Sequence, residues 1–208
     1  MNDLCRELNF SPKLYPKIDL SKYDTEGYNW ATFHKTPKPH ELNNDYLFEF
    51  LYCNYEITCD WIEFFYTPPN SDGIIHCDNT NFTQYTKIYF QYGAEGSTLR
   101  WWESKKISKV STTVQNNYVY IDDNESQIKR STDYSSHDVD ILVSDEKDAT
   151  MIHEKDLRLP HLVNIGKLHS PHNPTNEKRF ALTLAICDKN GERLLWDDAV
   201  NRLSDSIL

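Results

Sequence analysis

The sequence lacks the features of a membrane protein, of a disulfide-stapled domain and of a phosphate-binding loop. None of its apolar stretches approaches the roughly 20 residues that a membrane-spanning helix needs. Its five cysteines are scattered without a Cys-x-x-Cys pair, so neither a disulfide framework nor a zinc knuckle is indicated. No Gly-rich loop is present, and the start has no basic segment followed by an apolar core. We therefore expect a cytoplasmic protein that does not enter a membrane.

The chain also has no excess of positive charge. The chain has 22 Lys and Arg against 32 Asp and Glu, which gives a formal net charge of -10. A chain of this charge does not attract phosphates or anionic lipids overall, so we expect neither nucleic acid nor a membrane as its partner. A small-molecule or peptide substrate agrees better with this balance.

Aromatic side chains, by contrast, are plentiful, and two segments stand apart from the rest. With 13 Tyr, 9 Phe and 5 Trp, the 208 residues suit one packed domain over residues 1–208. Residues 1–40 hold several prolines and dispersed aromatics, which predicts an extended lead-in that packs onto the scaffold. Residues 122–156 carry eleven Asp or Glu against four Lys or Arg. This acidic insertion is solvated, either as a lid over a site or as a plain surface excursion.

Short strands dominate the predicted secondary structure. Apolar residues at three- and four-residue spacing, such as Leu47 and Leu51, predict one helix near residues 40–53, and residues 191–208 can form a turn and a short amphipathic helix. Runs of β-branched and aromatic residues between turn signals predict strands at residues 57–66, 86–93, 97–104, 116–123, 139–144 and 179–187. Many short strands with one or two helices predict a mainly β barrel or sandwich.

A His-x-Asp pair, His76 and Asp78, follows a turn signal. On an extended strand these two side chains share a face and can converge on one ion while Cys77 points away. The same pair can also be a capping Asp beside a partly exposed His. A 2-His-1-carboxylate site for Fe(II) needs a second histidine from elsewhere in the chain. His169, between an apolar segment and a turn signal, is the best candidate, and His172 is the second choice.

Arg179 opens an apolar strand. Alternation places it on one face with Ala181 and Thr183, opposite a bulkier face of Phe, Leu and Ile side chains. A guanidinium on a face lined by small residues leaves room for a ligand carboxylate, which it can bind with a bidentate fork. The alternative is an arginine at the surface of an edge strand.

Together these residues resemble the motif of the 2-oxoglutarate/Fe(II)-dependent oxygenases. The order is His76-x-Asp78, His169 some ninety residues later, and Arg179 ten positions beyond it. The flanking segments FFYTPPNSDGIIHCD, TKIYFQYGAEGSTLRWWE and LVNIGKLHSPHNPTNEKRFALTL are similar to the family's too, so the resemblance covers residues 57–105 and 160–187. It implies a double-stranded β-helix, which is a jelly-roll, cupin-like barrel. It also implies Fe(II) held by His76, Asp78 and His169, and 2-oxoglutarate anchored by Arg179.

The activity that the resemblance implies is a dioxygenase reaction. O2 and 2-oxoglutarate are consumed, succinate and CO2 are released, and a small molecule or a peptidyl side chain is hydroxylated. One position departs from the family, in which Ser or Thr often stands two residues after the basic anchor, where this chain has Ala181. Thr183 on the same predicted face and the hydroxyl of Tyr66 are the candidates to contact 2-oxoglutarate instead.

Two alternatives use the same strands. A cupin-like enzyme with a different metal would recruit His161 or His172 and would not need Arg179. A non-catalytic, cupin-like binding or structural barrel would need no metal at all. The sequence does not identify the substrate within the small-molecule and peptide classes, and it leaves the oligomeric state open.

Overall fold

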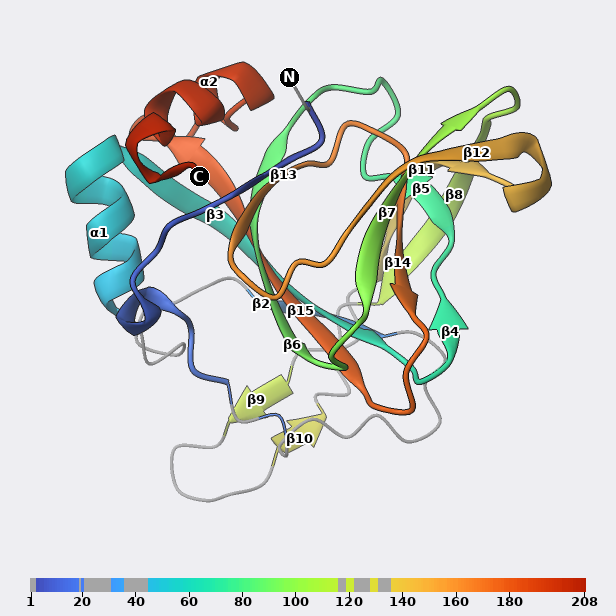
Figure 1. Cartoon of the computed structure of the whole chain (residues 1–208), viewed down its shortest axis with the longest axis horizontal. Helices are drawn as coiled ribbons and strands as arrows, with labels where there is room; N and C mark the ends of the chain where they lie inside the picture. The colour runs from blue at the N-terminus through green and yellow to red at the C-terminus, as the bar shows by residue number, and fades with distance from the viewer. Residues whose placement is uncertain are drawn as a thin grey trace.

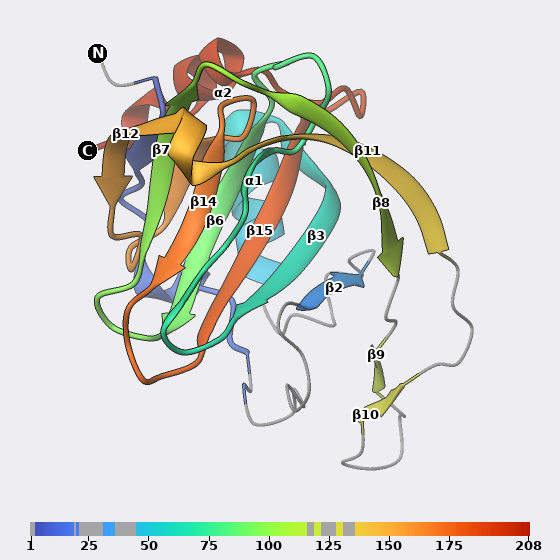
Figure 2. The ribbon, with the colours of Figure 1, turned by 90° about the vertical axis from the view of Figure 1, so that its right-hand side faces the viewer.

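The computed structural model describes residues 3–18, 20, 31–35, 45–115, 119–121, 128–130 and 136–208 (Figure 1). Two antiparallel sheets form the framework of this part of the chain, and two α-helices lie beside one of these sheets. Figure 2 shows that the two sheets curl around a shared interior. The prediction of a mainly β, jelly-roll barrel with one or two flanking helices is therefore confirmed.

The first sheet contains the longest strands of the molecule. Its order is β1-β13-β6-β15-β3-β2, with β1 (Cys5–Glu7), β13 (His161–Asn164), β6 (Thr86–Gly93), β15 (Arg179–Asp188), β3 (Ile57–Thr67) and β2 (Ala31–Lys35). Arg179 pairs with Thr67 on one side and with Gly93 on the other. This register places the arginine at the end of β15 between two neighbouring strands.

The second sheet faces the first across the interior. Its order is β12-β7-β14-β5-β11-β8, and β4 pairs with β14 beside this path. The strands are β12 (Ala149–Lys155), β7 (Thr98–Ser104), β14 (His169–Asn173), β5 (Ile75–Cys77), β11 (Ser136–Ser144), β8 (Ser108–Gln115) and β4 (Ser71–Asp72). The paired strands β8 and β11 extend away from the barrel, and the short strands β9 (Val119–Ile121) and β10 (Ile128–Arg130) lie beyond them (Figure 2).

Both helices pack on the outer side of the first sheet (Figure 1). These are α1 (Asp45–Tyr55) and α2 (Trp196–Arg202). Leu47 and Leu51 of α1 join Trp196 and Ala199 of α2 in the larger apolar cluster. The predicted helix near residues 40–53 is confirmed from Asp45 onward, since residues 40–44 lie outside the described part. No helix in the described residues is long and apolar enough to cross a membrane.

The strand β15 divides the apolar core in two. Phe180, Leu182, Leu184 and Ile186 pack toward the helices, as alternation predicts. On the other face, Ala181 belongs to a second cluster that also includes Leu99 and Trp101 of β7, so this face looks into the space between the sheets. Arg179 and Thr183 project into the same space, where they line a cavity.

Two segments that the sequence sets apart contribute strands. From residues 1–40, β1 and β2 form the two edges of the first sheet, and the 3-10 helix Pro12–Leu14 lies between them in the sequence. From residues 122–156, β11 and β12 belong to the second sheet, and the 3-10 helix Glu146–Asp148 connects them. Residues 1–2, 19, 21–30, 36–40, 122–127 and 131–135 of these segments lie outside the described residues.

Candidate metal centre and buried anion pocket

The second sheet brings the three predicted metal ligands together. His169 is the first residue of β14 and pairs directly with His76 of β5, while Asp78 follows β5 by one residue. The Nε2 atoms of His76 and His169 lie 3.3 Å and 3.5 Å from the same Asp78 oxygen, Oδ1. One ligand atom from each of the three residues lies within 4.8 Å of the other two. Among the described residues this is the one such group of His, Cys, Asp and Glu.

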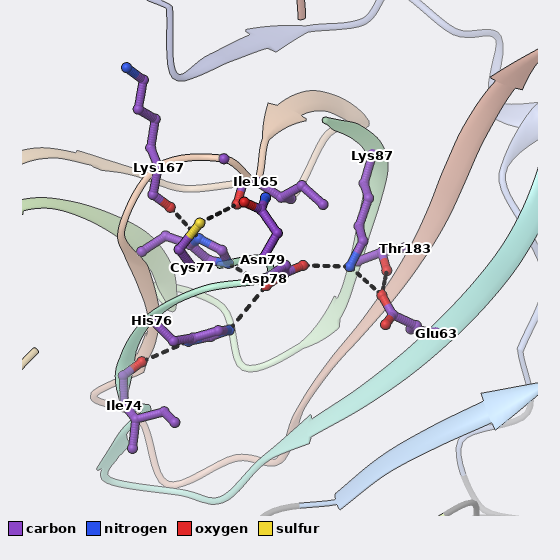
Figure 3. Close-up of polar contacts among 12 residues, drawn as sticks. Glu63, Ile74, His76, Cys77, Asp78, Asn79, Lys87, Ile165, Lys167 and Thr183 are labelled. Carbon is purple, nitrogen blue, oxygen red and sulfur yellow. Dashed lines mark hydrogen bonds and ion pairs between the residues drawn. The ribbon is translucent and has the colours of Figure 1, made fainter. Parts of the chain in front are cut away.

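Backbone hydrogen bonds fix the orientation of both imidazoles. Nδ1 of His76 lies 2.9 Å from the carbonyl oxygen of Ile74 (Figure 3), and Nδ1 of His169 lies 2.8 Å from that of Lys167. Because a carbonyl can only accept, each Nδ1 carries the proton and donates it. Nε2 is therefore the nitrogen that each imidazole turns toward Asp78. In the protonated form of His76 this nitrogen donates to the carboxylate, and loss of that proton leaves the lone pair that a metal ligand requires.

The donor set suits a divalent transition metal. Two imidazole nitrogens and one carboxylate oxygen make a donor set that several divalent transition metals accept. Asp78 and His76 are half-buried and His169 is buried. The site is therefore held rigidly by the sheet while remaining reachable from the cavity.

Burial and the carboxylate shift the pKa values of the three ligands in different directions. Burial lowers the pKa of His169 to about 4, and the charge of His76 adds to this effect. Burial lowers the pKa of His76 too, but hydrogen bonding to Asp78 and its charge outweigh burial and raise it. Burial alone would raise the pKa of Asp78, yet Lys87 and the two histidines hold it well below its usual range.

A lysine that was not predicted completes the polar cluster (Figure 3). Lys87 of β6 is buried, with Nζ 2.6 Å from Oδ2 of Asp78 and in direct contact with Oε2 of Glu63 on β3. Glu63 also accepts a hydrogen bond of 3.2 Å from Thr183. Burial would lower the pKa of Lys87, but the two carboxylates raise it, so the side chain is a permanent cation.

Arg179 lies at the other end of the same cavity and is only 1% exposed. Its Nη1 donates to Thr67 Oγ1 at 3.1 Å, Nε donates to Gln91 Oε1 at 3.3 Å, and Nη2 donates to the hydroxyl of Tyr89. No carboxylate among the described residues forms an ion pair with it. A buried cation with neutral partners alone is costly, and an anionic ligand would offset that cost.

The cavity between the metal ligands and Arg179 is small and mainly apolar. Its walls include Phe65, Leu99, Val163 and Ile165, and its volume is about 60 Å³. A cavity needs about 10–15 Å³ measured in this way to hold even one water, so this cavity is large enough to admit water or part of a small ligand.

The other predicted candidates lie in different places. Thr183 lines the cavity with Arg179, whereas Tyr66 does not reach it. Tyr66 projects from the opposite face of β3, where its ring packs 5.4 Å from that of Phe180 in the larger apolar cluster. His172 pairs with Asp72 on β4, away from the triad. His161 lines a separate cavity near β1.

Sequence reasoning missed Lys87, Glu63, Thr67 and Gln91, and it did not connect Tyr89 with Arg179. A signal for them exists in the strand alternation. On β6, Lys87, Tyr89 and Gln91 occupy every second position, between the apolar Ile88 and Phe90. A charged residue at an inward position of a buried strand indicates a functional or paired group, because such charges are rarely buried otherwise.

Comparisons with known proteins give distant likenesses of the fold. No family model matches the chain, and no curated protein matches it. Among solved structures the chain is similar to oxalate oxidase in complex with the substrate analogue glycolate, at 10% identity and a TM-score of 0.33, over 89% of this chain and 64% of that one. It is also similar to E. coli ycfD, at 12% identity and a TM-score of 0.28, over 66% of this chain and 28% of that one. The chain thus spans less than two thirds of either protein.

Proposed function

We propose that the protein is an Fe(II)- and 2-oxoglutarate-dependent dioxygenase. It would hydroxylate a small molecule or a peptidyl side chain and release succinate and CO2. The observation that carries the proposal is one cavity with two functional ends. The donor set of His76, Asp78 and His169 forms one end, and the buried cation Arg179 forms the other.

The charges in the cavity support a dicarboxylate as the co-substrate. Without ligands, the charges of Lys87 and Arg179 match those of the carboxylates of Asp78 and Glu63, and a metal ion on His76 and His169 would take the place of any proton on their Nε2 atoms. A divalent metal ion would add two positive charges in a site with little water. A ligand with two carboxylates restores the balance, and 2-oxoglutarate is such a ligand.

Each end of the cavity would hold one part of the co-substrate. Arg179 would bind the distal carboxylate by charge-assisted hydrogen bonds, while Thr67, Tyr89 and Gln91 keep its guanidinium in place. The apolar walls, including Phe65 and Val163, would exclude water and strengthen this pairing.

The three ligands would hold Fe(II) with open positions for the keto acid and for O2. Bound iron supplies the oxidising chemistry for substrate hydroxylation. The role of the protein would be to hold the ion, to orient the keto acid and to keep the cavity dry.

Anaerobic titration with Fe(II) and 2-oxoglutarate tests the proposal. We expect a visible metal-to-ligand charge-transfer band in the wild type and no band in His76→Ala. In Arg179→Met, the 2-oxoglutarate needed for half of the band should rise by about 100-fold, because a buried charge pair loses one partner.

His172→Ala is the matched control, since His172 lies on the same strand as His169 but outside the triad. It should keep the band of the wild type. Fe(II) binding without any band would contradict the 2-oxoglutarate assignment and favour a cupin-like enzyme with a different chemistry. Absence of metal binding would favour a non-catalytic binding barrel.

A further inference from the structure

Lys87 occupies an unusual position for a lysine. It is the second residue of β6, is only 5% exposed, and projects between the two sheets. Its ammonium group touches two carboxylates, one from Asp78 and one from Glu63 on β3, which lies beyond β15 in the same sheet. A buried lysine persists only when its charge is paired in this way, so the two carboxylates and the lysine form one unit.

The two oxygens of Asp78 have different partners. Oδ1 faces Nε2 of His76 and of His169, at 3.3 Å and 3.5 Å. Oδ2 is 2.6 Å from Nζ of Lys87. The lysine therefore fixes the rotation of the carboxylate, and only Oδ1 is presented to the space between the imidazoles.

The position of Lys87 is itself fixed from the other side. Glu63 contacts the lysine and accepts a hydrogen bond of 3.2 Å from Thr183 of β15. The ring of Phe65 lies 5.8 Å from the ammonium group, within the range of a cation–π contact. Lys87 is thus held against Asp78 by three residues of the first sheet.

We propose that Lys87 is an internal counter-ion for the metal ligand Asp78, an inference that rests on the metal site of the proposed function. The lysine supplies positive charge beside Asp78 when no metal is bound, which keeps the three ligands assembled. Once a divalent ion binds Oδ1, Lys87 repels it as a like charge at short range. The lysine therefore stabilises the metal-free protein and weakens metal binding, so that the metal exchanges readily.

The test is a variant that removes the pair while keeping its shape, Lys87→Met with Glu63→Gln. We measure the melting temperature of the metal-free protein and the Kd for Mn(II) under anaerobic conditions. The melting temperature should fall by about 5 °C or more, because Asp78 is left buried without a cation. The Kd for Mn(II) should fall by about tenfold or more, because the cation beside Asp78 is gone, whereas the Glu63 carboxylate that is lost with it stands on the far side of Lys87 (Figure 3).

Two controls separate this effect from general damage. Lys87→Arg keeps the charge, and its Kd for Mn(II) should stay within about threefold of the wild type. The variant Lys109→Met with Asp140→Asn removes an exposed ion pair and should change neither quantity.

Two results would overturn the role of Lys87. One is Mn(II) binding in the Lys87→Met, Glu63→Gln variant that is no tighter than in the wild type. The other is an unchanged melting temperature of the metal-free variant. Failure of the proposed metal site itself looks different, because the wild type would then bind Mn(II) no better than His76→Ala does.

Discussion

At the scale of single residues, two tyrosines of β6 point to opposite faces of the sheet and have different hydrogen-bond partners. The hydroxyl of Tyr89 contacts the guanidinium of Arg179 in the cavity, whereas that of Tyr92 donates to the carbonyl of Pro16 at 2.8 Å on the other face of β6. We expect Tyr89→Phe to raise the Kd for 2-oxoglutarate by about 10-fold, because a hydrogen bond to a charged group is lost. Iron affinity should not change. Titration of the charge-transfer band measures this, and Tyr92→Phe is the control that should leave the Kd unaltered.

The site residues that could be predicted from the sequence are those with a recognisable spacing. His76, Asp78, His169 and Arg179 stand at spacings that resemble a family motif, and Arg179 opens an apolar strand. Lys87 and Glu63 have no such spacing, since 24 residues separate them and the contact depends on how β6 and β3 both flank β15. Partners of this kind are set by strand order, which no local pattern encodes.

At the scale of elements, the turn between β13 and β14 carries His169 into the site. Gly166 in this turn packs so closely that an added Cβ would lie 2.3 Å from the carbonyl oxygen of Thr83 and 2.6 Å from Cα of Gln84. Backbone atoms cannot yield as a flexible side chain does, so the turn itself must shift. Glycine is therefore required here by a close approach of two segments, at normal φ.

We expect Gly166→Ala to lower the free energy of unfolding by about 2–3 kcal/mol, because it overpacks a rigid contact. It should also raise the Kd for metal by about tenfold, since His169 follows the displaced turn. Urea unfolding and Mn(II) titration measure the two effects. Gly191→Ala is the comparison: its φ of 86° brings backbone strain, but its Cβ meets nothing within 4 Å. That variant should lose stability while its metal affinity stays unchanged.

Strands and their faces follow from the sequence, but their pairing does not. The alternation on β15 correctly placed Arg179 and Thr183 opposite Phe180 and Leu182. The pairing of His76 with His169 joins segments that are some ninety residues apart, and it requires the barrel to close. Tyr66 lies one position away from Thr67, which does reach Arg179, and a shift of one residue along a strand exchanges the two faces of the sheet.

At the scale of the whole molecule, the two sheets supply the two halves of the site. The metal ligands lie on or beside strands of the second sheet, whereas Arg179, Lys87 and Glu63 belong to the first. We expect Mn(II) with saturating 2-oxoglutarate to raise the melting temperature by about 5–10 °C beyond Mn(II) alone, because a ligand bound only to the native state stabilises it. Differential scanning calorimetry measures this shift. In Arg179→Met the additional increase should vanish while the shift with Mn(II) alone remains.

The division of the site between two sheets has a mechanical consequence. A ligand that binds both Arg179 and a metal at the triad would connect the two sheets across the interior. Such a ligand would oppose any motion that moves the sheets apart. In the proposed reaction the keto acid would lose its C1 carboxyl group as CO2, and the product succinate would have one group fewer to offer the metal. The barrel would then tighten when the co-substrate binds and loosen when it is spent, so the release of succinate would be favoured by the same geometry that binds 2-oxoglutarate.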